Sequence, residues 1–251
     1  MSSIPQGPFH TLVVLGESNV QGGGWLTQES ERWPDVLARL LEEAQEVPLR
    51  YINTGVGASV ISPASPGYEA SAKPSAAERL DEAVIAHQPD LLVIAYGMND
   101  MRAGMPVDDF RAEMVALLRR IRQAGNPRFV LVNPYYMTAY HFYPPFDRGT
   151  PAAHVQYNSM LEKLAGEASC IYADAFSAVQ GCDHAVHQDT VHMNKLGCLL
   201  VAHAVFAAIV RATPGISDRI RRRDAETEWT RNIIDWQRSC VEPSDRSVPG
   251  R

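Results

Sequence analysis

Short apolar runs alternate with longer amphipathic segments over most of the chain. The runs have the length and composition of strands buried on both faces, and they span residues 9–15, 49–53, 91–96, 129–132 and 170–173. Apolar residues at three- and four-residue spacing predict helices between them, over residues 34–46, 75–87, 108–125, 152–166 and 194–212. This alternation predicts an α/β fold with a parallel sheet of about five strands between two helical layers, the run 91–96 being a central strand.

Polar residues gather where the apolar runs end. The four polar blocks are 16–19 (Gly-Glu-Ser-Asn), 53–58 (Asn-Thr-Gly-Val-Gly-Ala), 97–100 (Gly-Met-Asn-Asp) and 189–192 (Asp-Thr-Val-His). The carboxyl ends of parallel strands share one edge of the sheet, and ligands bind there. The blocks therefore predict a single site at this edge.

The first and last blocks hold the residue types of a serine nucleophile and its base. A serine hydroxyl attacks a carbonyl only when a neighbouring base takes its proton, and a carboxylate that orients a histidine makes such a base. We expect Ser18 to be the nucleophile, His192 the general base and acid, and Asp189 the residue that fixes the imidazole tautomer.

Acyl transfer also needs hydrogen-bond donors for the tetrahedral oxyanion. We expect these donors to be the backbone N–H groups of Ser18 and Gly57 and the side-chain amide of Asn99. The turn after the second run leaves a choice, because the amide of Ala58 can serve in place of that of Gly57.

A loop over residues 133–151 is rich in aromatic side chains, namely Tyr135, Tyr136, Tyr140, Phe142, Tyr143 and Phe146. Such side chains either wall a substrate pocket or cover the core, and the sequence fits both interpretations. We place Tyr135 and Tyr136 at the substrate, together with Glu17 and Ala58 of the polar blocks. The glycine-rich segment 21–25 is a further expected edge of the pocket.

Metal binding is a rival interpretation of the last block. Imidazole and carboxylate groups are crowded into this loop at Asp183, His184, His187, Asp189 and His192. Their spacing matches no ligand pattern on a helix face such as H-E-x-x-H. We therefore expect neither a metal nor an organic cofactor, and we expect His184 and His187 to be loop residues near the mouth of the site.

The four blocks resemble those of the SGNH, or GDSL-type, hydrolase superfamily of esterases and lipases. The block 97–100 matches the Gly-x-Asn-Asp of that family, and 189–197 matches its Asp-x-x-His followed by a polar residue and a glycine. The chain departs from the family at Glu17, where the family usually has aspartate, and at Ala58, where the family has glycine. The resemblance covers residues 9–212 and implies a flavodoxin-like three-layer fold and an acyl-serine intermediate.

The resemblance implies a reaction class and leaves the substrate open. We expect short-chain carboxylic esters, including acetyl esters of carbohydrates or small metabolites, because nothing in the sequence indicates a long lipid tunnel. A thioesterase or an acyltransferase uses the same acyl-serine and differs in the acceptor. A catalytically silent binding or scaffold protein is the alternative of another class, to which the departures at Glu17 and in the second block point.

Composition narrows the picture further. With 251 residues, 45% of them apolar and 21% charged, the chain fits a single globular catalytic domain over residues 1–213. A net charge of −6 gives no general attraction to nucleic acid or anionic membranes. We expect neither a signal peptide nor a membrane span, and the cysteines lack C-x-x-C spacing, so a cytoplasmic protein is expected.

Residues 214–251 form a C-terminal helical extension. A basic run over 219–223 precedes an apolar stripe of Trp229, Ile233, Trp236 and Cys240, which share one face of a helix. Such a face packs either on its own domain or against a second subunit, which makes the extension a candidate interface for a homo-oligomer.

Overall fold

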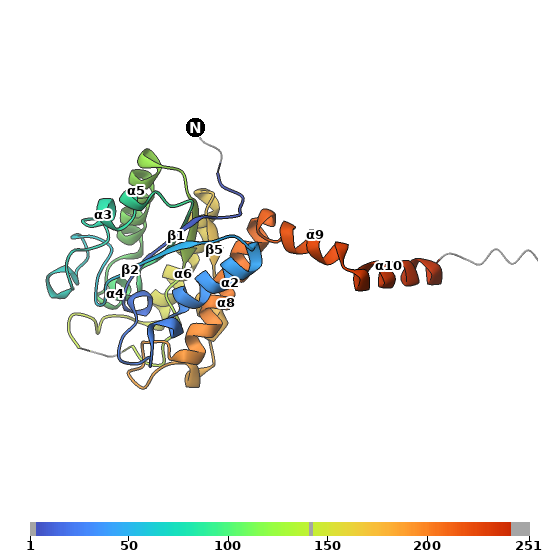
Figure 1. Ribbon diagram of the computed structural model, residues 1–251. Helices are drawn as coiled ribbons and strands as arrows, with labels where there is room; N and C mark the ends of the chain where they lie inside the picture. The colour runs from blue at the N-terminus through green and yellow to red at the C-terminus, as the bar shows by residue number, and fades with distance from the viewer. Residues whose placement is uncertain (1–3, 141–142, 242–251) are drawn as a thin grey trace, which may run out of the picture.

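A five-stranded parallel sheet forms the centre of the protein (Figure 1). The computed structural model describes residues 4–140 and 143–241. Its strands are β1 (Thr11–Gly16), β2 (Arg50–Gly55), β3 (Leu91–Ala95), β4 (Arg128–Val132) and β5 (Ile171–Ala173). They lie in the order β2-β1-β3-β4-β5, that of a flavodoxin-like doubly wound sheet. The predicted fold class and the central position of β3 are therefore confirmed.

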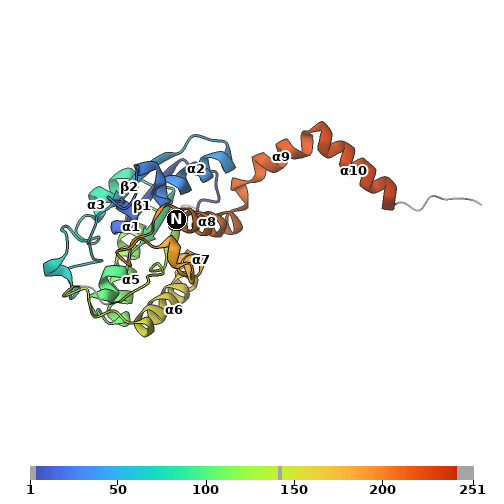
Figure 2. The same cartoon turned by 90° about the horizontal axis from the view of Figure 1, so that it is seen from below.

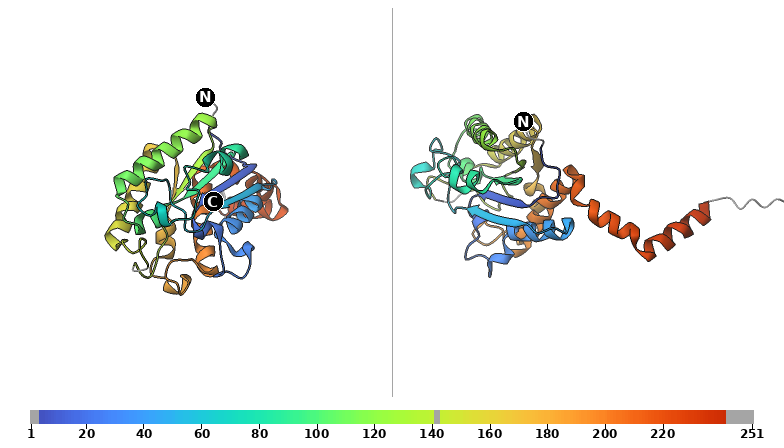
Figure 3. Two further views of the ribbon diagram at one scale, coloured as in Figure 1. Left: turned by 90° about the vertical axis from the view of Figure 1, so that its left-hand side faces the viewer. Right: turned by 45° about the horizontal axis from the view of Figure 1, so that its top comes forward.

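Helices cover both faces of the sheet (Figures 2 and 3). On one face α2 (Trp33–Gln45) packs against α8 (Lys195–Ala212), and on the other α5 (Val107–Ala124) packs against α6 (Pro151–Glu167). The short helices are α1 (Ser18–Gln21), α3 (Leu80–Ala83), α4 (Met98–Arg102) and α7 (Ala175–Val179), and the 3₁₀ turns are η1 (Glu29–Glu31), η2 (Tyr68–Ala70), η3 (Ile85–His87) and η4 (Asp183–Ala185).

The helix α8 is apolar on nearly all sides. Its length and composition would suffice to cross a membrane, but it packs against α2, α7 and β5 as a core helix. The side chain of Asn194 caps its start by accepting hydrogen bonds from the N–H groups of Leu196 and Gly197. This cap fixes where the loop that carries His192 enters the helix.

The helix predicted over 75–87 is wrong. Only Leu80–Ala83 and Ile85–His87 are helical, because residues 76–78 form turns and Val84, with a φ of −132° and a ψ of −59°, interrupts the helical backbone between the two segments. The N–H groups of Ala76 and Ala77 donate to the carbonyls of Val60 and Ile61 and hold the start of the segment against the preceding loop.

The C-terminal extension leaves the domain in two steps. The turn η5 (Pro214–Ile216) still belongs to the core, since Ile216 is fully buried and touches the position of Gly7. The helix α9 (Asp218–Glu226) then binds Glu46 through Arg223, and α10 (Glu228–Val241) projects beyond it (Figures 1 and 3).

The predicted apolar stripe faces solvent in the single chain, with Trp229 74% and Trp236 63% exposed. The rest of the predicted extension, residues 242–251, lies outside the described residues.

Candidate active site

Ser18 lies at the carboxyl end of β1, where the strand order reverses between β1 and β3. The strand turns directly into α1 at Gly16. A Cβ atom at this glycine would lie 2.3 Å from Val20 Cγ2 and 2.9 Å from the carbonyl oxygen of Ala95, so only glycine fits the turn. The tight turn makes Ser18 the first residue of α1.

The structure brings together the three residues that the sequence predicted to be catalytic. The hydroxyl of Ser18 lies 2.8 Å from His192 Nε2, and His192 Nδ1 lies 2.8 Å from Asp189 Oδ2. The other oxygen of Asp189 accepts the backbone N–H groups of Val191 and His192, at 3.1 and 3.0 Å. The carboxylate thus keeps the imidazole proton on Nδ1 and leaves Nε2 free to accept the serine proton.

The local environment sets the charge states of this pair. Burial lowers the pKa of His192, and the hydrogen bond and charge of Asp189 offset the shift only in part. Burial alone would raise the pKa of Asp189, but the hydrogen bonds from His192 and Val191 outweigh it and bring this pKa well below its usual range. At neutral pH the site therefore holds a neutral imidazole and an ionised carboxylate.

Asn19 connects the two ends of the chain at this site. Its Oδ1 accepts the N–H of Met193 at 2.9 Å, and its Nδ2 donates to the carbonyl of Val191 at 3.4 Å. These two residues flank His192, so the neighbour of the nucleophile holds the loop that carries the base. The sequence showed Asn19 in the first block but gave no sign of this role.

The indole of Trp25 stacks on the His192 ring, with centroids 3.7 Å apart and planes 11° apart. The glycine-rich segment folds back onto the same indole, since a Cβ atom at Gly23 would lie 2.3 Å from the Trp25 ring. The expectation that this segment borders the site agrees with its position. The stacking itself has no signature in the sequence.

His187 contacts the same carboxylate oxygen as the base. Its Nδ1 lies 2.9 Å from Asp189 Oδ2, while His184 lies farther along the loop. Within residues 4–140 and 143–241, no three His, Cys, Asp or Glu side chains are grouped so that they could hold a metal ion.

Asn99 is fixed from two directions. It lies in α4 after Gly97, whose φ of +119° favours glycine. Its backbone N–H and that of Gly97 donate to Glu17 Oε1 at 3.3 and 3.0 Å, and its Nδ2 donates to the carbonyl of Ser59 at 2.9 Å. Because an amide nitrogen carries two hydrogens, one donor of Asn99 remains for another acceptor.

Glu17 does not face a substrate, contrary to the expectation from the sequence. Its side chain is 4% exposed, and its carboxyl group holds the amides of Gly97 and Asn99 instead. Burial raises the pKa of Glu17 well above its ordinary value, and the nearby carboxylate of Asp100 adds to the shift. Glu17 is therefore a positioning residue that joins the first and third polar blocks.

Gly57 lies beside Ser18, as its block predicts. A Cβ atom at Gly57 would be 3.8 Å from Ser18 Cβ. The Gly57 N–H donates to Gln21 Oε1 at 2.7 Å, so a side chain of this protein already occupies the expected oxyanion donor. The neighbouring Ala58 is exposed and has a φ of +55°.

The two tyrosines expected at the substrate lie in different surroundings. Tyr135 is 3% exposed and packs against Trp33 of α2, so it belongs to the core and not to a pocket wall. Tyr136 is half-buried, and its hydroxyl donates to Asp183 Oδ1 at 2.7 Å. Phe142 of the same aromatic loop lies outside the described residues.

Two polar hollows are lined by residues that neighbour the three catalytic candidates. One of about 630 Å³ is lined by Gln21, Gly22, Gly23, Leu26, Thr27, Gln28, Glu29 and Arg32. Another of about 750 Å³ is lined by Thr138, Asp183, His184, Val186, His187, Gln188 and Asn194. Gln21 lines the first hollow and shares α1 with Ser18. His187 lines the second hollow and contacts Asp189.

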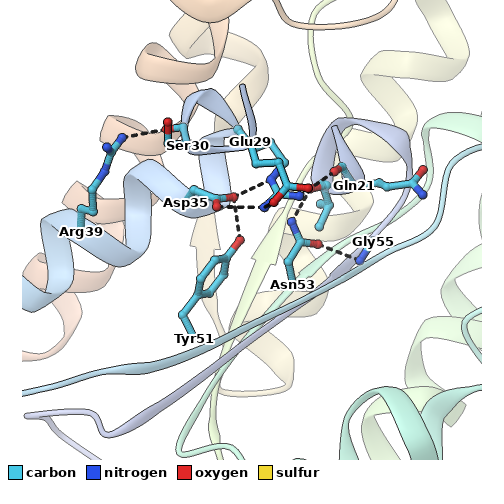
Figure 4. Close-up of polar contacts among 10 residues, drawn as sticks. Gln21, Glu29, Ser30, Asp35, Arg39, Tyr51, Asn53 and Gly55 are labelled. Atoms are coloured by element: carbon cyan, nitrogen blue, oxygen red, sulfur yellow. Dashed lines mark hydrogen bonds and ion pairs between the residues drawn. The ribbon is translucent and has the colours of Figure 1, made fainter. Parts of the chain in front are cut away.

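A network of hydrogen bonds and ion pairs lies beside the first hollow (Figure 4). Arg32 donates to both oxygens of Asp35 at 2.7 and 3.0 Å and to the carbonyl of Gln21 at 3.3 Å. Asn53 of the second block accepts the N–H of Gly55 and donates to the carbonyl of Val20. The predicted second block therefore fixes the end of α1 as well as its own turn.

Comparison with known proteins yields one family and a set of similar folds. Residues 14–199 match the model of the GDSL-like lipase/acylhydrolase family. Axe2, an acetylxylan esterase from Geobacillus stearothermophilus, has 19% identity and a TM-score of 0.61, over 80% of this chain and 94% of its own. LAE5, an alpha/beta hydrolase enzyme from the metagenome of Lake Arreo, Spain, has 17% identity and a TM-score of 0.62 over the same shares. No curated protein sequence matches the chain.

Proposed function

This chain belongs to the GDSL-like lipase/acylhydrolase family and is an ester hydrolase, and we propose that it cleaves short-chain carboxylic esters through an acyl-serine intermediate. One observation carries the proposal. Ser18, His192 and Asp189 form an unbroken series of hydrogen bonds at the carboxyl edge of the sheet. A neutral imidazole there is ready to accept a proton at neutral pH.

Acylation begins when Ser18 Oγ attacks the ester carbonyl carbon and its proton passes to His192 Nε2. The carbonyl oxygen becomes an oxyanion as the new C–O bond forms. When this intermediate collapses, the bond to the alcohol oxygen breaks, and that oxygen takes the proton from Nε2. The alcohol leaves, and the acyl group remains on Ser18.

Water completes the cycle by the same steps. His192 takes a proton from the water while its oxygen attacks the acyl carbon, and the proton then returns to Ser18 Oγ as the acid leaves. An alcohol in place of water would give acyl transfer, and a thioester substrate would form the same acyl-serine.

The donors proposed for the oxyanion come from three elements. Ser18 is the first residue of α1, so its N–H has no acceptor within the helix. The second hydrogen of Asn99 Nδ2 and the N–H of Gly57 complete the set, the latter after release from Gln21. Loss of one such donor commonly lowers kcat by ~10²–10³-fold.

The proposed substrate class is acetyl or similarly short acyl esters of polar alcohols. The polar linings of both hollows support a hydroxyl-rich alcohol over a long hydrocarbon chain. Axe2 is described as an acetylxylan esterase. Structures of its catalytic mutants replace a serine, an aspartate and a histidine, the last two spaced three positions apart as Asp189 and His192 are.

The first test compares p-nitrophenyl acetate hydrolysis by the wild type and by Ser18→Ala, each with and without chelator. We expect the substitution to lower kcat by at least ~10³-fold and the chelator to have no effect. Ser239→Ala on exposed α10 is the matched control and should behave as the wild type.

A set of p-nitrophenyl esters from acetate to octanoate then measures the acyl preference. Activity that survives in Ser18→Ala and disappears with chelator would favour a metallohydrolase. No activity on any ester would favour the silent scaffold.

A further inference from the structure

Gln21 places a carbonyl oxygen of this protein where a substrate oxygen is expected. Its Oε1 lies 2.7 Å from the N–H of Gly57, which lies next to Ser18. The amide oxygen of Gln21 is a neutral acceptor like the carbonyl oxygen of an ester. The free protein thus fills its own oxyanion donor with a side chain.

The backbone of Gln21 is fixed. Its N–H donates to the carbonyl of Glu17 at 3.0 Å, and its carbonyl accepts from Arg32 at 3.3 Å. Arg32 is itself held by two bonds to Asp35. A Cβ atom at Gly55 would lie 2.3 Å from the nitrogen of Gln21, so strand β2 closes the other side.

The side chain of Gln21, in contrast to its backbone, has room to rotate. The residue is exposed, and Figure 4 shows its side chain pointing away from Asp35 and Glu29. Gln21 lines the hollow of about 630 Å³, which offers space for another rotamer. Rotation of the carboxamide therefore releases Gly57 without moving α1 or Ser18.

We propose that the Gln21 carboxamide is an internal acceptor that occupies the Gly57 donor in the free enzyme and rotates away when the substrate carbonyl binds. This inference rests on the proposed esterase function. Hydrogen bonds to a charged acceptor are roughly twice as strong as neutral ones, so the oxyanion displaces Gln21 more effectively than the ground-state ester does. Both the bound ester and the transition state must displace Gln21, so the competition raises KM and leaves kcat unchanged.

Gln21→Ala tests the inference through the two kinetic constants for p-nitrophenyl acetate. Without a competing acceptor, KM should fall about 3- to 10-fold, the value of one net hydrogen bond, while kcat stays within about twofold. Gln21→Glu should have the opposite effect and raise KM by at least about tenfold, because a carboxylate holds the N–H more strongly and repels the oxyanion. Gln123→Ala on the exposed face of α5 is the matched control.

The amide proton of Gly57 gives a second readout that does not depend on activity. In ¹H–¹⁵N spectra of the free protein, we expect it to move upfield in Gln21→Ala, as it does when a hydrogen bond is lost. A KM in Gln21→Ala that is unchanged or higher, with hydrolysis still dependent on Ser18, would overturn the inference. Absence of hydrolysis dependent on Ser18 in the wild type would instead overturn the proposed function, and the Gly57 signal would still decide whether the hydrogen bond exists.

Discussion

The two proposed oxyanion donors, Asn99 and Gly57, are held in contrasting ways. Asn99 is 6% exposed and is bound by the buried Glu17 and by the carbonyl of Ser59. Gly57 lies in a more open turn and is bound by the exposed side chain of Gln21. One proposed donor is preorganised, and we propose that the ligand releases the other. A single site can therefore keep a rigid half for charge stabilisation and an adaptable half for substrate entry.

The largest effect should follow loss of the rigid donor. Asn99→Ala removes a preorganised hydrogen bond to the oxyanion, so we expect kcat for p-nitrophenyl acetate to fall ~10²–10³-fold with little change in KM. The exposed Asn232→Ala on α10 is the control. A decrease in kcat of less than about fivefold would mean that Asn99 is not an oxyanion donor.

A smaller effect should follow when the support of Asn99 is removed. Glu17→Ala leaves the buried N–H groups of Gly97 and Asn99 without their acceptor, so the free energy of unfolding should fall by about 2–4 kcal/mol in urea titrations. We expect kcat to fall roughly tenfold as Asn99 loses its position.

Glu17→Gln tests whether the shape or the charge of the Glu17 side chain supports Asn99. Burial raises the pKa of Glu17 well above its ordinary value, so a neutral amide of the same shape should retain both hydrogen bonds. We expect its stability and kcat to stay close to the wild type. A loss as large as that of Glu17→Ala would show that the ionised carboxylate is needed.

The pH profile tests His192 as the proposed general base. Burial lowers the pKa of His192, so the imidazole stays neutral to a pH below its ordinary value, and kcat/KM should fall only when the pH drops past this lowered pKa. Trp25→Ala uncovers one face of the ring and should raise the pKa toward its ordinary value. The acid limb of the profile should then move to higher pH, with a kcat decrease of roughly tenfold or less. An unmoved limb would give Trp25 no part in setting this pKa.

The smallest effect on activity should come from removing α10. A chain ending at residue 227 keeps the buried Ile216 and the contacts of α9, so its kcat and KM should equal those of the full chain. Sedimentation velocity should show the full chain as a dimer or larger assembly and the truncated chain as a monomer, because the exposed indoles of Trp229 and Trp236 leave water on pairing. Equal sedimentation of both chains would exclude an interface at α10.

The sequence predicted the strands and the catalytic candidates because both follow from local order. Ser18 and Asn99 each lie in a polar block directly after a strand, and parallel strands bring such blocks to one edge. His192 lies in the loop between η4 and α8, and its Asp-x-x-His spacing marked it as a candidate. Membership of a block does not reveal where a side chain points. Glu17 and Tyr135 were therefore placed at the substrate although both are buried.

The features that the sequence did not predict depend on contacts between distant segments. The helix expected over 75–87 is interrupted at Val84, and Ala76 and Ala77 at its start are bonded to another loop. Local periodicity expresses neither feature. The bond between Gln21 and Gly57 likewise joins residues 36 positions apart, and nothing in either segment marks it. Such pairings depend on which strands become neighbours, and this appears only in the folded chain.

The direction in which the tail leaves the domain has a consequence for access. Helices of a parallel α/β fold run back against the strands, so α8 begins beside His192 at one edge of the sheet and ends at the other. There Ile216 packs near Gly7, ahead of β1, and the tail departs. A partner or a solid support bound by α10 would therefore attach to the protein at the edge of the sheet opposite His192. The proposed active site at the opposite edge of the sheet would then stay accessible to substrate.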